Sequence, residues 1–203
     1  MKVITKAEQD LITPGEALSK LVVGNKRFTE KKAFNRDYAS QVSEASNGQF
    51  PFAAILSCID SRVPVEIVFD LGIGDVFSAR VAGNIVNEDI LGSLEYACKV
   101  AGSKLIVVLG HTKCGAVTAA CKNVELGNIT ALLSKIKPAV NMLKVGNELT
   151  ESQIEQVSVQ NVKLSIENIR QESSILSNME KEGQIEIVGA IYDVSNGRVE
   201  FLK

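Results

Sequence analysis

The sequence contains no tryptophan, a single histidine, four cysteines and four prolines among 203 residues. Four cysteines are too few for the disulfide framework that stabilises small secreted domains, so we expect a cysteine here to bind a metal, act in catalysis or lie buried. Positive and negative charges nearly balance, with a net charge of −2. Nothing in this balance suggests the strongly basic face that nucleic-acid-binding proteins use.

Long apolar stretches are also missing, since none reaches the roughly 18 residues that a membrane span needs. Glu8 and Asp10 interrupt the N-terminal segment before it forms the apolar core of a signal peptide. The sequence therefore predicts a cytoplasmic protein with no membrane partner. Its length favours a single domain over residues 1–203.

Apolar runs alternate with helical patterns along the chain. Strands are expected at residues 52–57, 75–79 and 104–109, and helices at 14–32, 88–100, 114–121, 132–145 and 154–179. Pro138 should bend or divide the fourth helix. Two further strands, 185–192 and 198–202, flank Asn196-Gly197, a strong hairpin signal. The sum predicts an α/β fold, with a mostly parallel central sheet flanked by helices and an antiparallel C-terminal edge hairpin.

Chemically unusual residues follow two of these strands. Cys58 comes directly after the first strand, and His111 and Cys114 follow the strand at 104–109. Open α/β sheets bind ligands at the carboxyl ends of their strands. Two cysteines and one histidine form a known catalytic zinc set that leaves a fourth position for water. The alternative is that the cysteines are simply buried, which we favour for Cys98 and Cys121 because both fall inside helical patterns.

Asp60 and Arg62 lie close behind Cys58, and three roles are open for them. They could form a surface ion pair that contributes about 0–1 kcal/mol. Asp60 could bind the metal as a fourth ligand and close the site. Alternatively, a bidentate pair with Arg62 could hold Asp60 away from the metal, which would leave room for a water.

The two motifs, Cys-x-Asp-x-Arg and then His-x-x-Cys-Gly, resemble the signature of the β-class carbonic anhydrases. The similarity extends to GNKRF at Gly24–Phe28 and to residues 57–84 and 94–117. The resemblance implies an N-terminal helical arm over about residues 1–45 and one Zn²⁺ per chain. It implies Cys58, His111 and Cys114 as the ligands, and Asp60 with Arg62 as a catalytic dyad.

The resemblance also implies a substrate pocket. In the plant-type branch of the family, the matching pocket positions are Gln49, Phe77, Tyr96 and Gly115. A second branch is regulated by bicarbonate at a site that uses tryptophan, which this chain lacks, so the plant-type branch is the better match. Family members form dimers or larger assemblies. We therefore expect a homodimer or tetramer in which pocket residues serve a neighbouring subunit's zinc.

The function implied by the resemblance is reversible hydration of carbon dioxide to bicarbonate and a proton by zinc-bound hydroxide, a lyase activity. One alternative keeps the zinc and hydrolyses carbon disulfide or carbonyl sulfide. Another is a non-catalytic, zinc-stabilised module with Asp60 as the fourth ligand. A redox sensor that forms a disulfide between Cys58 and Cys114 is also open, although the sequence lacks the Cys-x-x-Cys motif typical of such proteins.

The donor set generates a prediction about pH. Two thiolates cancel the charge of zinc, whereas three neutral histidines leave it intact, so a water bound here should have a higher pKa than in a three-histidine site. We expect kcat/KM for carbon dioxide hydration to rise between about pH 6.5 and about pH 9, the range in which such a water titrates. Stopped-flow assays at constant ionic strength measure this, and a flat profile contradicts it.

Overall fold

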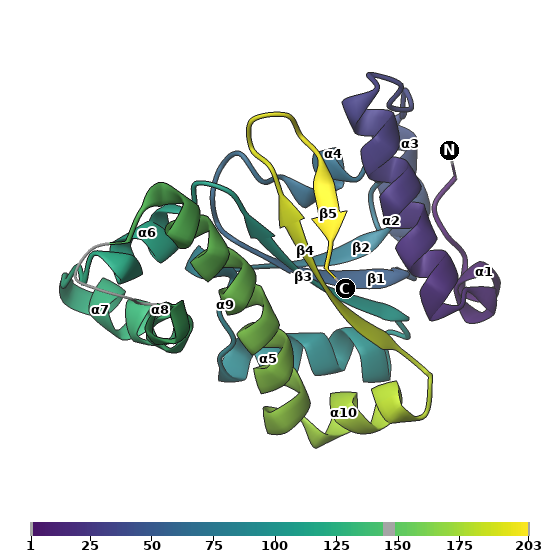
Figure 1. Cartoon of the computed structure of the whole chain (residues 1–203). Helices are drawn as coiled ribbons and strands as arrows, with labels where there is room; N and C mark the ends of the chain where they lie inside the picture. The colour runs from purple at the N-terminus through teal and green to yellow at the C-terminus, as the bar shows by residue number, and fades with distance from the viewer. Residues whose placement is uncertain (1, 144–148, 203) are drawn as a thin grey trace.

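A five-stranded sheet forms the centre of the computed structural model, which describes residues 2–143 and 149–202 (Figure 1). Its order is β2-β1-β3-β4-β5. The strands are β1 (Ala53–Ser57), β2 (Val76–Arg80), β3 (Leu105–His111), β4 (Glu186–Tyr192) and β5 (Val199–Phe201). The first four are parallel, and β5 runs antiparallel to β4. The predicted α/β fold with an antiparallel C-terminal edge is confirmed.

Helices precede the sheet and connect its strands. Before β1 lie α1 (Lys6–Leu11), α2 (Pro14–Thr29) and α3 (Tyr38–Ala45). Between β1 and β2 lies α4 (Val65–Val68), and between β2 and β3 lie η1 (Ala82–Asn84), α5 (Glu88–Glu95) and the π-helix η2 (Tyr96–Val100). Between β3 and β4 lie α6 (Gly115–Cys121), α7 (Gly127–Ser134), α8 (Lys137–Leu143), α9 (Glu151–Glu172) and α10 (Ser174–Lys181).

Two of the predicted helices are divided in the structure. As expected near Pro138, α7 ends at Ser134 and α8 begins at Lys137, while the predicted residues 144 and 145 lie outside the described residues. The helix expected over 154–179 breaks at Ser173, whose extended backbone lets its side chain accept a hydrogen bond from the Leu176 N–H. That N-cap starts α10 as a separate helix. The short helices α1, α3 and α4 were not predicted, because each has too few residues for a periodic apolar stripe.

The apolar strands are buried on both faces. On one face, Ile55 and Val107 pack in a cluster with residues of α2 and α4. On the other face, Leu56 and Val108 pack with residues of α5, α9 and α10, and Figure 1 shows these three helices together on one side of the sheet. Burial on both faces explains why β1 and β3 have uninterrupted apolar sequences instead of alternating ones.

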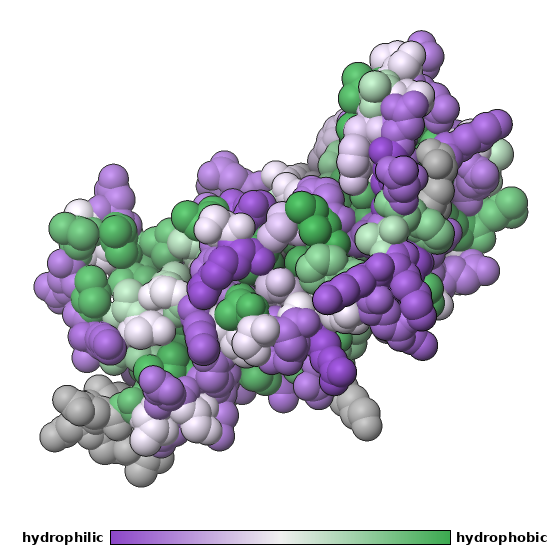
Figure 2. Space-filling model, turned by 90° about the horizontal axis from the view of Figure 1, so that it is seen from above, coloured by the Kyte–Doolittle hydropathy of each residue, from purple (hydrophilic) through white to green (hydrophobic). Residues whose placement is uncertain are grey.

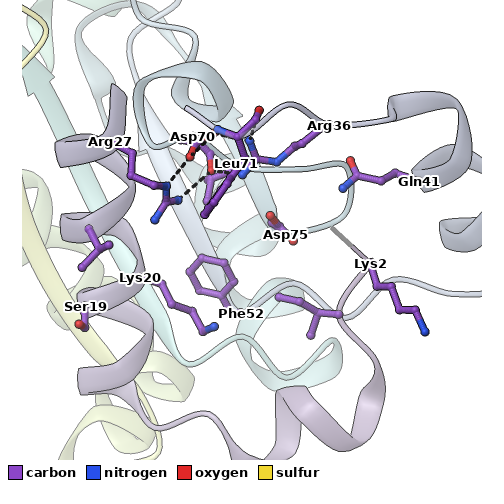
Figure 3. Close-up of a pocket in the computed structure, with 13 residues that line it drawn as sticks. Lys2, Ser19, Lys20, Arg27, Arg36, Gln41, Phe52, Asp70, Leu71 and Asp75 are labelled. Carbon is purple, nitrogen blue, oxygen red and sulfur yellow. Dashed lines mark hydrogen bonds and ion pairs between the residues drawn. The ribbon is translucent and has the colours of Figure 1, made fainter. Parts of the chain in front are cut away.

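A buried carboxylate joins the N-terminal helices to the end of α4. Asp70 is 4% exposed, and it accepts a hydrogen bond from Arg27 Nε at 2.5 Å, another from Arg36 Nη1, and the Phe34 N–H (Figure 3). Burial raises the pKa of Asp70, but the bonds from Arg36 and Arg27 outweigh burial and lower it. Because the pKa is lowered, this interaction stabilises the fold at neutral pH and loses its effect on acidification. It borders a pocket of about 300 Å³ beside α2.

Figure 2 shows a mostly hydrophilic face with scattered hydrophobic residues. Exposed apolar side chains that occur singly are normal on globular proteins. Among the described residues, none of the helices is both long and apolar enough to cross a membrane. The single domain with an arm over residues 1–45 stays a prediction.

Candidate metal centre

The three predicted ligands converge where β1 and β3 end. Cys58 follows β1 directly, and His111 is the last residue of β3. Cys114 is the N-cap of α6, one residue before the first helical turn in which the sequence pattern placed it. Because β2 lies on one side of this strand pair and β4 on the other, the site occupies the point where the strand order reverses. Ligand sites of open α/β sheets are found at this point.

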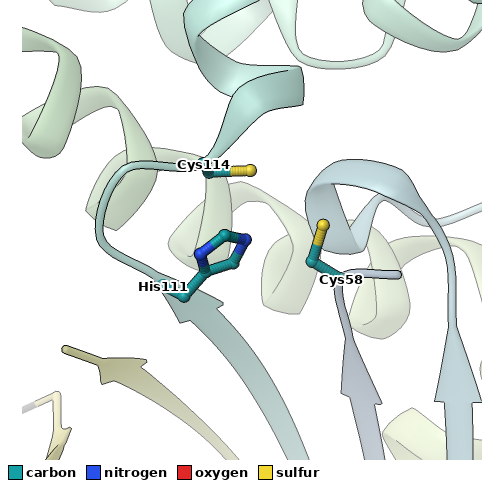
Figure 4. Close-up of side chains that lie close together, drawn as sticks. All are labelled: Cys58, His111 and Cys114. Carbon is teal, nitrogen blue, oxygen red and sulfur yellow. The ribbon is translucent and has the colours of Figure 1, made fainter. Parts of the chain in front are cut away.

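The ligand atoms of Cys58, His111 and Cys114 lie within 4.8 Å of one another, and Figure 4 shows the three side chains directed toward a common point. All three residues are buried, with exposures of 4%, 0% and 1%. The structure therefore brings together the set that the sequence pattern selected. Its donors, two sulfurs and one imidazole, are those that zinc prefers.

The hydrogen bonding of the His111 imidazole shows whether the cluster suits a metal ion. Its Nδ1 lies 2.9 Å from the Thr112 carbonyl oxygen, which assigns the ring proton to Nδ1 as the donor. Its Nε2 is buried and has no hydrogen-bond partner among the residues that the structure describes. An unpaired nitrogen beside two sulfurs is costly in a folded protein unless it binds something. Zn²⁺ fits this arrangement, because the Nδ1 contact fixes the tautomer that leaves Nε2 free to bind.

The two thiols influence one another. The hydrogen bond with Cys114 lowers the pKa of Cys58, against the effect of burial. The same contact, with burial, raises the pKa of Cys114. The Gly83 N–H donates to Cys58 Sγ at 3.3 Å, and this bond also favours the thiolate. A metal ion bound here would need both sulfurs deprotonated, since cysteine binds metals as the thiolate.

Asp60 lies beside the ligands and is held by Arg62 in the bidentate arrangement. Arg62 donates from Nε to Oδ1 at 2.9 Å and from Nη2 to Oδ2 at 2.7 Å, and its backbone N–H donates to Oδ1 at 2.9 Å. These bonds, foremost those of the Arg62 side chain, lower the pKa of Asp60 to about 2. Asp60 Oδ2 lies 4.0 Å from His111 Nε2, so the ionised carboxylate faces the cluster.

Two residues that the sequence analysis did not select hold the backbone of the site. Arg80 donates from Nε to the Cys58 carbonyl at 3.0 Å and from Nη2 to the Asp60 carbonyl at 2.6 Å. Gly83 has φ 69°, and a Cβ there would lie 2.6 Å from Ile136 Cδ1. Only glycine adopts this turn without strain or a clash. Both residues follow the strand predicted at residues 75–79, and this position at a strand end was the one sequence feature that could have indicated a role at the site.

Three of the four predicted pocket residues lie away from this chain's own cluster. Phe77 and Tyr96 contact each other, with ring centroids 6.1 Å apart, and line a pocket of about 660 Å³ at the β2 edge. Phe77 pairs in register with Ala54, four residues before Cys58 and so roughly 13 Å away along the strand. Gln49 is exposed before β1 begins, and the exposed Gly115 follows Cys114.

Comparison with known proteins decides the family. Residues 53–199 match the family model described as carbonic anhydrase. The chain belongs to the carbonic anhydrase family. It is 34% identical over 194 residues to carbonic anhydrase 2 of Mycobacterium tuberculosis, covering 91% of each protein. It is 32% identical over 193 residues to the carbonic anhydrase of Mycolicibacterium smegmatis, covering 92% of each.

Solved structures place the chain in the β class. The β-carbonic anhydrase CafA of Aspergillus fumigatus superposes with a TM-score of 0.73 at 27% identity, covering 92% of this chain and 90% of that one. The β-carbonic anhydrase CcaA superposes with a TM-score of 0.76 at 23% identity, covering 92% and 95%, and supports the fold alone. The resemblance to β-class carbonic anhydrases is confirmed, and the chain is an enzyme of this class.

The geometry of Asp60 generates a mutational prediction. Arg62→Ala removes both side-chain donors to the carboxylate, and Asp60 is then free to turn toward the ligands. We expect kcat/KM for carbon dioxide hydration to fall by about 10- to 100-fold, the usual effect of losing a partner of a metal site. Stopped-flow assays of the zinc-loaded protein measure the loss.

Arg170→Ala is the matched control. Arg170 forms a similar bidentate pair with Glu180, at 2.8 and 2.7 Å, between α9 and α10. We expect this substitution to change kcat/KM by less than about twofold, since a partly exposed ion pair contributes little to stability. Equal losses in the two variants would contradict a specific role for Arg62.

Proposed function

We propose that the chain catalyses the reversible hydration of carbon dioxide to bicarbonate and a proton, with one Zn²⁺ bound by Cys58, His111 and Cys114. The observation that carries this proposal is the buried cluster of two sulfurs and an unpartnered imidazole nitrogen beside the ionised Asp60. Membership of the carbonic anhydrase family supports the reaction.

The chain's own residues supply orientation and charge. When bound, zinc acts as a Lewis acid that lowers the pKa of a coordinated water toward neutrality. Asp60 has a pKa of about 2, so at neutral pH its carboxylate only accepts hydrogen bonds. It can therefore hold the O–H of a water beside the cluster and leave a lone pair directed at the substrate. Arg62 keeps Asp60 in that role by occupying both carboxylate oxygens.

Proton release must use a route without a second imidazole. His111 is the only histidine in the sequence, and its Nδ1 is already bonded to the Thr112 carbonyl. Water, Tyr96 or external buffer is left as the carrier. The rate of proton release should then depend on the buffer concentration, because the sequence has no second histidine to carry the proton.

The substrate pocket belongs to the same proposal. We assign the chain to the plant-type branch, with Gln49, Phe77 and Tyr96 serving the zinc of a neighbouring subunit in a homodimer or tetramer. Tyr96 is 51% exposed and contacts Phe77 of the edge strand β2, and Gln49 lies at the opposite end of β1 from Cys58. Neither side chain reaches its own cluster, which favours action across an interface. Gly115 stays in the proposal as the residue whose backbone N–H faces the substrate.

Stopped-flow carbon dioxide hydration at about pH 8.5, where a zinc-bound water is ionised, tests the reaction directly. We expect fast hydration by protein that carries one zinc per chain. We expect the activity to be lost in Cys114→Ser, because a serine hydroxyl is a poor zinc ligand. Zinc-loaded protein that is inactive on carbon dioxide but releases sulfide from carbon disulfide would overturn the proposed substrate. Inactivity on both would favour a non-catalytic module.

Mixed dimers test whether Gln49 acts in trans. Cys114→Ser chains lack a ligand, and Gln49→Ala chains lack the pocket amide. We expect the Gln49→Ala protein alone to be about 10-fold less active, as for a lost hydrogen bond to substrate. After subunit exchange at equal amounts, half of the dimers are mixed and each contains one complete site, so activity should recover to about a quarter of wild type. Verified mixed dimers without recovery would contradict action across the interface.

A further inference from the structure

The long helix α9 has a row of buried polar residues on one face, near the metal centre. Ser158, Asn161 and Ser165 are each 3% exposed, and they recur at the three- to four-residue spacing of one helix face. The apolar residues of α9, such as Val162 and Ile169, pack against the sheet instead. A buried polar row is costly unless each member has a partner, so those partners indicate what the row does.

Asn161 holds the turn that supports Cys58. Its Nδ2 donates to the Gly83 carbonyl at 2.8 Å in a fully buried bond. The N–H of the same Gly83 donates to Cys58 Sγ. Ser165 Oγ donates to the next carbonyl, that of Asn84, at 3.2 Å. Gly83 and Asn84 both have positive φ, at 69° and 42°, so this turn depends on contacts from outside.

One and a half turns earlier on the same helix, Glu155 holds the loop that carries the other two ligands. Its carboxylate accepts the Lys113 N–H at 2.8 Å, and Lys113 lies between His111 and Cys114 with φ 55°. Arg62 Nη2 donates to the carbonyl of this same Lys113 at 3.2 Å. The backbone of Lys113 is therefore fixed on one side by α9 and on the other by the arginine that holds Asp60.

We propose that α9 is the positioning element of the zinc site, with Asn161 fixing the turn that donates to Cys58 and Glu155 fixing the loop between His111 and Cys114. The inference rests on the proposed function, because it concerns the same zinc. The physical reason is that the ligand-bearing segments are irregular backbone, while α9 is a rigid helix of 22 residues. Groups that orient ligands from behind commonly determine how firmly a metal is held.

The test uses zinc retention and a spectrum instead of activity. Asn161→Leu keeps the side chain's shape and removes its donor. Glu155→Ala removes the acceptor, and Glu155→Gln restores one through its amide oxygen. Ser158→Ala is the matched control, since Ser158 is equally buried and its hydroxyl donates to the Ile154 carbonyl of its own helix. Zinc transfer to a chromophoric chelator and the thiolate-to-cobalt absorption of Co²⁺-loaded protein are measured for each variant.

We expect zinc transfer to be about 10-fold faster in Asn161→Leu and in Glu155→Ala, with an altered cobalt spectrum. Glu155→Gln and Ser158→Ala should stay within about twofold of wild type, since each keeps the backbone contacts. Unchanged zinc release and spectra in folded Asn161→Leu and Glu155→Ala would overturn the inference. If Asn161→Leu does not fold, the comparison of Glu155→Ala with Glu155→Gln tests the inference, because Glu155 is only half-buried. A wild-type chain that holds no zinc would instead overturn the proposed function, and the inference with it.

Discussion

The parallel pairing of β1 with β3 sets the position of every group in the metal centre. Ser57 pairs with Leu109, so Cys58, one residue past Ser57, and His111, two residues past Leu109, both lie at the carboxyl edge of the sheet. This register is strongly determined, because both strands are buried on both faces and a slip of one residue would exchange those faces. Cys58 and His111 therefore meet at this edge because of the strand pairing.

Hydrogen bonds to backbone groups hold the segments that carry the candidate ligands. Carbonyl oxygens bonded by Arg80 and Arg62, together with the Gly83 N–H at Cys58 Sγ, fix the irregular segments around the ligands. In a site this buried, each such dipole acts at a low dielectric constant and has a large effect on charge. Burial also makes an unpaired nitrogen costly. His111 Nε2, which has no partner among the described residues, is therefore expected to bind a metal ion.

The candidate ligands lie together in the single chain, whereas the predicted pocket residues Phe77 and Tyr96 lie apart from them. The cluster lies at the carboxyl ends of β1 and β3, whereas Phe77 of the edge strand β2 and Tyr96 of η2 contact each other at a separate pocket. An edge strand presents unpaired backbone groups, and proteins usually cover or pair such an edge. A second subunit placed there would cover the edge and bring the pocket residues to another site. This geometry supports the proposed oligomer.

The sequence by itself determined the alternation of strands and helices, the ligand set and the Asp60–Arg62 pair, because each is encoded in local periodicity or short spacing. Pro138 and Asn196-Gly197 likewise marked breaks in the chain through their own backbone preferences. Only the tertiary structure decided which distant groups support the ligands. Arg80, Gly83 and Asn161 gave no signal as a set, since they lie on a strand, a turn and a late helix. Strand order and helix packing bring them together, and these depend on burying apolar faces far from the site.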